Sequence, residues 1–232
     1  MIKRLLSVII LKRSVLFILF FFVLVEGYTQ LPQGFSLLEK NAKEIVLDIK
    51  YSSRDNFMGR VIEGYDRKGT PLTNETIAAL KSAQKAFNAL GFGIKLFDGY
   101  RPQKAVDDFI EWGKNEADTL TKNTFYPDLE KKELFAQGYI AQRSGHSRGS
   151  TVDITLIYLN EENDLQEVDM GGRYDFFGER SNFDFEDITK EQKQARILLR
   201  KVMMKNGFVP YAMEWWHFTL KDEPFPMTYF DF

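Results

Sequence analysis

The chain has 232 residues, a hydrophobic fraction of 44%, an aromatic fraction of 15% and a formal net charge of −2. This composition is that of a globular protein, and 31 basic against 33 acidic residues, without a Lys/Arg-rich block after the N-terminal region, argue against nucleic acid as a partner. The absence of cysteine excludes disulfides, thiolate metal sites, cysteine nucleophiles and lipoprotein anchors, so that only histidine and carboxylate could hold a metal ion.

The first thirty residues are typical of a targeting signal. The apolar run 15–25 follows a basic stretch whose charged residues are Lys3, Arg4, Lys12 and Arg13. This run is shorter than the roughly 20 residues of a membrane-spanning helix, but it matches the apolar core of a signal peptide. We therefore expect residues 1–30 to be a signal peptide or an N-terminal anchor, and residues 31–232 to be the catalytic domain of an exported protein, periplasmic or extracellular. We expect no membrane span in the mature protein unless the N-terminal segment is retained.

The folded part begins with a predicted strand and a predicted helix. Period-two alternation of Ile45, Leu47 and Ile49 predicts a strand over 44–51 with one buried face. Thr73 or Asn74 caps the helix, and Gly91 ends it. The inward face of this helix is predicted to consist of Ile77, Leu80, Ala83, Phe87 and Leu90.

A polar turn separates the next strand from the next helix. The strand is predicted over 94–97, and the turn has the sequence DGYRP at 98–102. Pro102 suits the first turn of the helix that follows, because proline lacks an N–H that this position does not need. A further short helix is predicted at about 129–137.

The C-terminal half contains the longest predicted strand and helix. The strand 151–159 has Val152 and Ile154 on one face and Asp153 on the other. After a loop-like segment, 160–187, Thr189 has capping-box spacing to Gln192 and starts a helix that ends at Gly207, before aromatic-rich strands. Strands and helices do not alternate regularly, so the sequence favours a single α+β domain with a mostly antiparallel central sheet flanked by helices.

Both histidines of the chain lie near an acidic residue. His146 lies in a Gly/Ser-rich turn and Asp153 on the strand after it, so the turn allows the two side chains to converge. Imidazole and carboxylate suit Zn²⁺ where no thiolate is available. Two ligands do not hold zinc tightly, and His217 is the only other histidine. We therefore predict one zinc site formed by His146, Asp153 and His217, although either histidine alone could be structural.

Glu214 and Arg101 supply the remaining parts of a catalytic zinc site. Such a site has three protein ligands, an open position for water and a carboxylate that takes the proton of that water. Glu214 lies three residues before His217 and could be this base; as a further ligand it would leave no base nearby. Arg101 could stabilise an oxyanion or bind a substrate carboxylate, with Asp98 orienting it. Its alternatives are a helix cap and a surface ion pair.

Four segments resemble a known family. They are GYRPQKAVDDF at 99–109, SGHSRGSTVDITL at 144–156, MGGRYDFFGERS at 170–181 and EWWHFTLKDEPFP at 214–226. These segments are similar to those of D-alanyl-D-alanine dipeptidases of the VanX type, within the zinc D-Ala-D-Ala metallopeptidase family. The motifs S-x-H-x-x-G-x-x-x-D and E-x-x-H occur across the wider family, whereas DGYRP, RYDF and DEP-aromatic-P point to the dipeptidase branch.

The resemblance implies the family fold, one zinc ion per chain and a role for each matching residue. His146, Asp153 and His217 align with the zinc ligands, Glu214 with the catalytic base and Arg101 with the arginine that stabilises the tetrahedral intermediate. The residues that align with the substrate pocket are Tyr51, Asp98, Ser144 and Asp175. The implied activity is hydrolysis of D-alanyl-D-alanine to free D-alanine by metal-activated water, in turnover of cell-wall peptides. Residues expected to exclude water from the site are Trp215, Trp216 and Phe218.

Two other functions remain open. The chain could be a D,D-carboxypeptidase or endopeptidase of the same family that acts on longer peptidoglycan peptides, or a non-catalytic peptidoglycan-binding domain. Glu214 and Arg101 argue against a binding domain, because such a domain needs no base beside an open metal position. Gly145 stands where serine is common, and the loop 160–168 is longer than in the relatives. These departures leave the stringency for dipeptides open.

Overall fold

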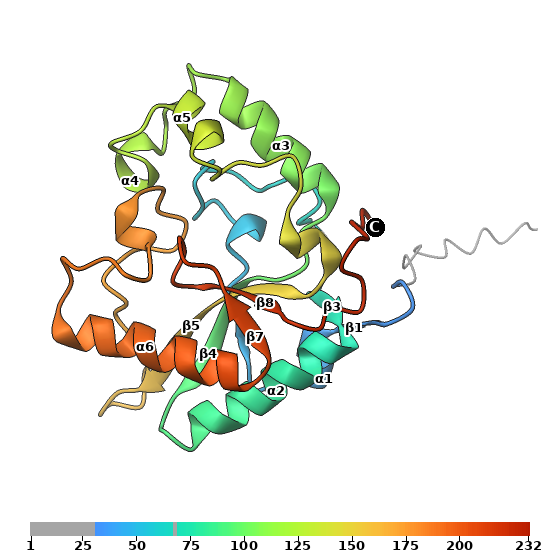
Figure 1. Cartoon of the computed structure of the whole chain (residues 1–232), viewed down its shortest axis with the longest axis vertical. Helices are drawn as coiled ribbons and strands as arrows, with labels where there is room; N and C mark the ends of the chain where they lie inside the picture. Colours follow the sequence, from blue (N-terminus) through green and yellow to red (C-terminus); the bar gives the residue numbers. More distant parts are fainter. Residues whose placement is uncertain (1–30, 67–68) are drawn as a thin grey trace, which may run out of the picture. The chain divides into compact units, whose positions relative to one another are not determined.

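The computed structural model describes residues 31–66 and 69–232, and its centre is a six-stranded sheet (Figure 1). The strands follow in the order β2, β4, β5, β8 and β7, and β6 pairs with β5. Only the β2–β4 pair is parallel. The expectation of an α+β fold with a mostly antiparallel sheet is therefore confirmed. The strands span Val46–Leu47 (β2), Gly93–Asp98 (β4), Thr151–Leu159 (β5), Leu165–Glu167 (β6), Phe208–Pro210 (β7) and His217–Leu220 (β8).

A small second sheet and six helices complete the described part of the chain. The second sheet is the antiparallel pair β1 (Phe35–Leu37) and β3 (Pro71–Thr73). Figure 1 shows α2 and α6 running along one side of the main sheet, with α3, α4 and α5 on the opposite side. The helices span Leu38–Asn41 (α1), Asn74–Asn88 (α2), Gln103–Lys114 (α3), Lys122–Phe125 (α4), Lys131–Ala136 (α5) and Lys190–Lys205 (α6). Three short 3₁₀ turns span Lys50–Ser52 (η1), Gly145–Arg148 (η2) and Glu179–Ser181 (η3).

The helix starts predicted from capping residues are confirmed. The Thr73 hydroxyl accepts a hydrogen bond from the backbone N–H of Thr76 at the start of α2. At the start of α6, Thr189 and Gln192 form a reciprocal capping box. Each cap satisfies backbone N–H groups that the first helical turn leaves without a partner. These two helices carry much of the apolar surface that covers the sheet.

Several predicted boundaries are wrong. The strand expected over 44–51 is reduced to Val46–Leu47, because its pairing with β4 ends there and the chain turns into η1. This turn buries Tyr51 away from the sheet. Leu90 was expected on the inward face of α2 but is exposed, because the helix ends at Asn88. Pro102 is the N-cap residue of α3, one position before the first helical turn.

Two apolar cores lie on the two sides of the site described below. The first core joins the sheet to α2 and α6 and includes Leu80, Ile154, Leu199 and Trp216. The second core is rich in aromatic rings and is formed mainly by η1, α3, α5 and the loops around them. Its members include Tyr51, Phe57, Phe109, Trp112 and Phe177. Polar side chains that lie between these cores are therefore shielded from bulk water on both sides.

The N-terminal prediction concerns residues that the structure does not describe. The proposed signal peptide or anchor, residues 1–30, lies outside the described residues. Within 31–66 and 69–232, no helix is both long and apolar enough to cross a membrane.

Candidate metal centre and substrate pocket

Strand register brings Asp153 and His217 together. Asp153 of β5 and His217 of β8 are directly paired across the antiparallel ladder. His146 comes from η2, the 3₁₀ turn that immediately precedes β5, where the Ser144 hydroxyl accepts a hydrogen bond from the His146 backbone N–H. Gly149 ends this turn with a φ of +76°, and a Cβ there would collide with the ring of Phe35. A glycine is therefore required for the turn that returns His146 to the start of β5.

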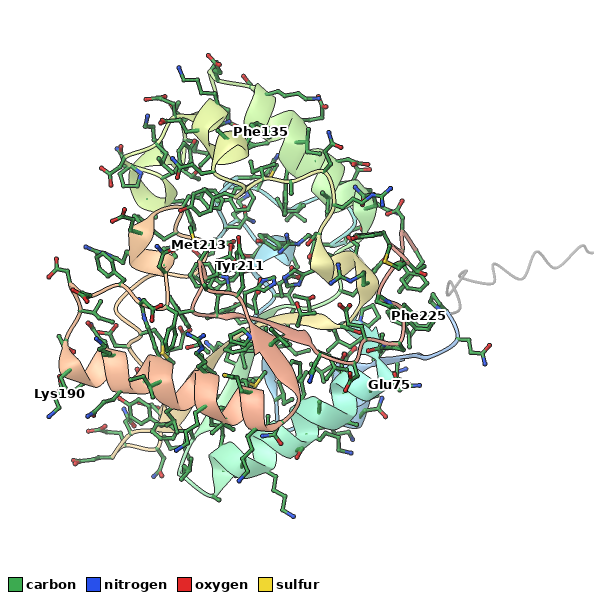
Figure 2. The ribbon with its side chains drawn as sticks, viewed as in Figure 1. Glu75, Phe135, Lys190, Tyr211, Met213 and Phe225 are labelled. Carbon is green, nitrogen blue, oxygen red and sulfur yellow. The ribbon has the colours of Figure 1, made fainter. Side chains whose placement is uncertain are left out.

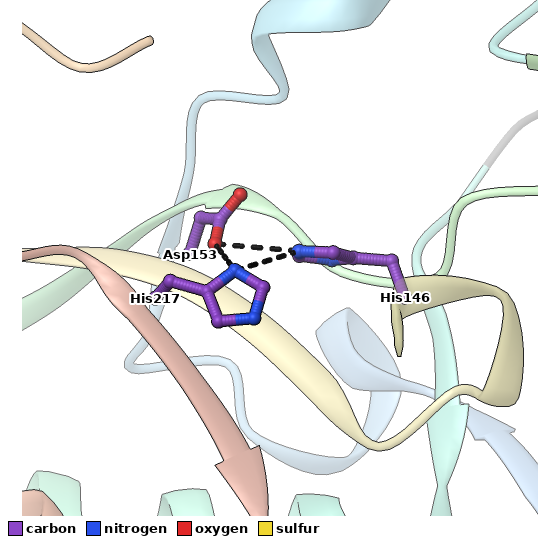
Figure 3. Close-up of side chains that lie close together, drawn as sticks. All are labelled: His146, Asp153 and His217. Atoms are coloured by element: carbon purple, nitrogen blue, oxygen red, sulfur yellow. Dashed lines mark hydrogen bonds and ion pairs between the residues drawn. The ribbon is translucent and has the colours of Figure 1, made fainter. Parts of the chain in front are cut away.

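Three donor atoms of these residues lie at nearly equal separations (Figure 3). His146 Nε2 is 3.3 Å from His217 Nδ1 and 3.3 Å from Asp153 Oδ1, and His217 Nδ1 is 3.0 Å from Asp153 Oδ1. Zinc–ligand distances of about 2.0–2.2 Å in a tetrahedron place neighbouring ligand atoms roughly 3.3 Å apart. The spacing and the N, N, O donor set therefore fit a zinc ion. Asp153 Oδ1 is also buried without a hydrogen-bond partner, as expected of an atom whose partner is a metal.

Neighbouring groups orient these donors. His146 Nδ1 lies 2.7 Å from the carbonyl oxygen of Gly99, which can only accept, so Nδ1 carries the proton and Nε2 keeps its lone pair. The Tyr174 hydroxyl donates to Asp153 Oδ2 at 3.0 Å, and this leaves Oδ1 facing the two imidazoles. Burial raises the pKa of Asp153, but the adjacent His146 and His217 outweigh burial and hold its pKa below the ordinary value. A carboxylate at this position is therefore ionised and ready to bind a cation.

Glu214 lies beside the three donor atoms. It belongs to the tight segment between β7 and β8, and its Oε2 lies 3.4 Å from His217 Nδ1. Burial raises the pKa of Glu214, an effect that the nearby His217 partly opposes. Tyr211 of the same segment lines the pocket, with its ring 5.6 Å from the His217 ring. Figure 2 shows Tyr211 in the middle of the view, between α6 and the layer of α3 to α5.

Arg101 is held by Asp98 behind the pocket. Arg101 Nε and Nη2 donate to Asp98 Oδ2 at 3.0 and 2.8 Å, and Nη2 lies 3.8 Å from Asp153 Oδ2. Asp98 is completely buried, and its Oδ1 accepts hydrogen bonds from the Tyr65 hydroxyl and the Gly99 N–H. Asp98 therefore orients Arg101 and, unlike Arg101, does not line the pocket.

A cavity of about 250 Å³ opens onto these groups. It is smaller than the roughly 300–1,000 Å³ of pockets that hold drug-sized ligands. All predicted site residues except Asp98 line it, namely Tyr51, Arg101, Ser144, His146, Asp153, Asp175, Glu214 and His217. Of the three residues expected to exclude water, Trp216 lines this cavity, whereas Trp215 and Phe218 do not. Rings of the aromatic core, among them Phe57 and Phe177, close its other side.

Asp175 lines this cavity and has one oxygen without a hydrogen-bond partner. The Tyr51 hydroxyl donates to Asp175 Oδ1 at 3.0 Å, whereas Oδ2 is buried and makes no hydrogen bond. Burial, followed by the negative charge of Asp153, raises the pKa of Asp175 well above the ordinary value. The residue has a φ of +60°, which is unusual for a residue other than glycine. A cationic group in the cavity would supply the missing partner.

Tyr174 and Tyr65 are parts of the site that the sequence did not reveal. The Tyr174 hydroxyl contacts both Asp153 Oδ2 and, at 3.3 Å, the Tyr51 hydroxyl. The Tyr65 hydroxyl donates a hydrogen bond to Asp98, and its ring packs against that of Tyr51 with the ring centroids 5.3 Å apart. Tyr174 lies in the RYDF segment that already marked Asp175, so that motif was the available signal. No motif marked Tyr65, because its contact depends on a loop far from Asp98 in the chain.

Comparison with known proteins identifies the family. The sequence profile that matches residues 33–232 describes the D-ala-D-ala dipeptidases. The chain belongs to this family. A D-alanyl-D-alanine dipeptidase of Enterococcus faecalis is 43% identical over 202 residues, which cover 87% of this chain and 98% of that protein. A D-alanyl-D-alanine dipeptidase of Streptomyces coelicolor is also 43% identical, over 85% of this chain and 96% of that protein.

The D-ala-D-ala dipeptidase family therefore accounts for nearly all of the described chain, as the resemblance predicted. Among solved structures, a zinc-bound mutant of the vancomycin-resistance D,D-pentapeptidase VanY is 15% identical, with a TM-score of 0.40. That alignment covers 66% of this chain and 75% of the VanY chain. The curated relatives are matched almost from end to end, so the extra length of this chain lies outside what those dipeptidases contain.

Proposed function

We propose that this protein is a zinc-dependent dipeptidase that hydrolyses D-alanyl-D-alanine to two molecules of D-alanine. The proposal rests above all on one observation: His146, Asp153 and His217 have ligand atoms 3.0–3.3 Å apart and line the same small cavity as Asp175, whose Oδ2 is unpaired. A free dipeptide brings both an amide bond to be hydrolysed and an ammonium group to be paired. Membership of the D-ala-D-ala dipeptidase family and the names of the curated relatives support the same substrate.

His146, Asp153 and His217 would hold the zinc ion. Bound zinc lowers the pKa of water towards about 7 and polarises a carbonyl group. The Gly99 carbonyl and the Tyr174 hydroxyl keep His146 and Asp153 in the orientation that ligation needs. No thiolate competes for the ion, because the chain has no cysteine.

Each side chain around the three metal-ligating residues would have a separate role in the reaction. Glu214 accepts a proton from the attacking water and returns it to the leaving amine. Arg101, which is held in place by its hydrogen bond to Asp98, stabilises the negative charge that develops on the carbonyl oxygen. Asp175 and Tyr51 pair with the ammonium group of the dipeptide. Ser144 lies on the same cavity wall as His146 and is placed to contact the substrate.

Metal removal and reloading test this proposal. Protein comprising residues 31–232 is stripped with a chelator, titrated with zinc and incubated with D-Ala-D-Ala, L-Ala-L-Ala or a pentapeptide that ends in D-Ala-D-Ala. We expect hydrolysis of D-Ala-D-Ala to return as zinc reaches one equivalent per chain, with little hydrolysis of the other two substrates. Preferred release of D-alanine from the pentapeptide would favour a carboxypeptidase. Zinc binding without hydrolysis of any of them would favour a binding domain.

We also propose that the protein is exported and acts on cell-wall peptides. The basic stretch and the apolar run within residues 1–30 support export. Fractionation of cells that produce the full chain, beside cells that produce residues 31–232 alone, tests the location. The full chain is expected outside the cytoplasm, as a shortened soluble form or bound to the membrane, and the shorter chain inside it. Equal retention of both chains in the cytoplasm would contradict export.

A further inference from the structure

Arg196 is a buried cation with no carboxylate of the described residues within ion-pair distance; the negative charge of Asp169 acts on it from farther away. It lies near the middle of α6, is only 1% exposed, and takes part in none of the ion pairs found among the described residues. Its side chain donates instead to three backbone carbonyls: Nε to Met170 at 2.6 Å, Nη1 to Asn182 at 2.6 Å and Nη2 to Arg180 at 2.9 Å. Burial lowers the pKa of Arg196 to about 10, so the guanidinium is still charged at neutral pH. Burying a charge is costly, and an aliphatic side chain would fill this space without that cost.

The three carbonyls belong to the two ends of one loop. Met170 stands at its beginning and Arg180 and Asn182 at its end, so the guanidinium joins backbone positions ten or more residues apart. The loop between them contains no strand or α-helix, only the short turn η3 near its end. Gly172 allows the approach, because a Cβ at this position would lie 3.2 Å from Arg196 Nη2 and 3.1 Å from the Arg180 carbonyl.

The middle of the same loop carries Tyr174 and Asp175. The Tyr174 hydroxyl donates to Asp153, and Asp175 lines the cavity and has one oxygen without a hydrogen-bond partner. The φ of +60° at Asp175 is a left-handed conformation that costs more than an extended one for a residue other than glycine, although aspartate tolerates it better than most. The guanidinium also lies over the ring of Trp215, which is the neighbour of Glu214 in the chain.

We infer that Arg196 is a positioning residue for recognition of the substrate's amino group. Its hydrogen bonds hold the two ends of the loop 170–182 together and thereby keep Asp175 in position at the wall of the cavity. The inference rests on the proposed function, because the amino group is that of the proposed dipeptide. Arg196 does not line the cavity, and its hydrogen-bond partners are backbone carbonyls and not the predicted metal ligands. Its effect is exerted through Asp175 and the loop backbone. Lysine cannot replace it fully, since a single ammonium group does not present donors in three fixed directions.

The test compares Arg196→Met and Arg196→Lys with Leu199→Ala. Leu199 is completely buried on the same helix and makes none of the three hydrogen bonds to the loop carbonyls, so its truncation reports the effect of a lost core contact without the loss of those bonds. The readout is the ratio of kcat/KM for D-Ala-D-Ala to that for N-acetyl-D-Ala-D-Ala, which lacks the ammonium group, together with zinc content. We expect Arg196→Met to lower this ratio by about 10-fold to 100-fold through KM, and Arg196→Lys to lower it less. Zinc content should stay at one equivalent in both variants.

Leu199→Ala is the control that separates a loss of stability from a loss of substrate discrimination. Leu199→Ala should lower the melting temperature and leave the substrate ratio unchanged. An unchanged ratio in folded Arg196→Met protein, or an equal fall in Leu199→Ala protein, would reduce Arg196 to a purely structural role.

Hydrogen exchange of the backbone amides provides a second measurement that needs no activity. The Phe177 and Ser181 amides of the loop make backbone hydrogen bonds, as do those of β5. In Arg196→Lys, which is the variant more certain to fold, we expect exchange within the loop to accelerate about tenfold while exchange in β5 is unchanged. An equal acceleration of exchange in the loop and in β5 would overturn the inference that Arg196 holds the loop. If the unaltered protein hydrolyses no D-Ala-D-Ala, the proposed function fails, and the exchange result still decides whether Arg196 holds the loop.

Discussion

The two sides of the pocket are built by different means. On one side, Asp153 and His217 are register partners on neighbouring strands, and their positions follow from backbone hydrogen bonds of the sheet. On the other side, Asp175 lies in a loop without regular structure, and side chains hold it: Tyr51 by a direct hydrogen bond and Arg196 through the loop ends. The Tyr174 hydroxyl connects the two sides by its hydrogen bond to Asp153.

This difference indicates that the sheet side and the loop side of the pocket have separate functions. A ladder of backbone hydrogen bonds holds ligand atoms at the separations that a metal requires, and it changes little when one side chain is replaced. A loop held by side chains can differ in shape without disturbing the sheet, as expected of a segment that selects the substrate. Substitutions on the sheet side should therefore act on metal binding and turnover, and those on the loop side on substrate affinity.

The largest effect is expected from Glu214→Gln. Glutamine retains the size of the side chain but cannot accept the proton of water, so kcat should fall by about 10²-fold to 10⁴-fold. Zinc content should stay at one equivalent, because the three donor atoms are unchanged. The matched control is Glu191→Gln, an exposed position on α6, which should be fully active. A Glu214→Gln protein with nearly normal kcat would contradict the role of Glu214 as base.

Asp153→Asn should remove the metal. The amide binds zinc more weakly than a carboxylate does, so zinc content measured after gel filtration should fall well below one equivalent. The loss of affinity should exceed the roughly 10-fold to 100-fold effect typical of residues that only orient a ligand. Excess zinc should restore part of the activity. Retention of zinc at full stoichiometry would show that Asp153 is not a ligand.

Asp175→Asn is the same chemical change on the loop side, and here zinc content should be normal. Loss of one charged hydrogen bond to the ammonium group should raise KM by about 10-fold to 100-fold. Because the pKa of Asp175 is raised, this carboxyl takes up a proton at a higher pH than an ordinary aspartate. In the unaltered protein, KM should therefore rise as the pH falls through that pKa, and the variant should lack this dependence. A pH dependence of KM that persists in Asp175→Asn would assign it to another group.

Tyr174→Phe tests the connection between the two sides. Removing the hydroxyl frees Asp153 Oδ2 and takes away one contact of Tyr51, so zinc affinity should fall by about tenfold and KM should rise by a smaller factor. The control Tyr158→Phe alters a partly exposed tyrosine elsewhere on β5 and should change neither. If only KM changes, Tyr174 belongs to the loop side alone.

The smallest effect is expected from Thr189→Ala, at the start of the helix that carries Arg196. Loss of this capping box should cost about 1 kcal/mol of unfolding free energy. For a chain of this size, that cost lowers the melting temperature by about 2–4 °C. Substrate discrimination should be unaffected, because Arg196 lies well inside the helix. The exposed Thr228 provides a control, Thr228→Ala, that should leave the melting temperature unchanged.

The sequence by itself determined the fold class, the long helices and many of the polar residues that line the cavity. Periodicity and capping are local properties, so Thr73, Thr189 and the strand 151–159 could be interpreted without knowledge of their neighbours. The scarcity of histidine pointed to His146 and His217, and motif resemblance added Asp175. Each of these signals lies within a few residues of the group that it marks.

Only the tertiary structure decided what depends on contacts between distant segments. The strand expected over 44–51 ends after Leu47, because its length depends on how far β4 pairs with it. The burial of Asp98 behind Arg101 depends on the packing around it, and Tyr65, Tyr174 and Arg196 join the site through hydrogen bonds to residues far away in the chain. Such contacts leave no local pattern, because burial and partner choice are set only when separate elements pack together.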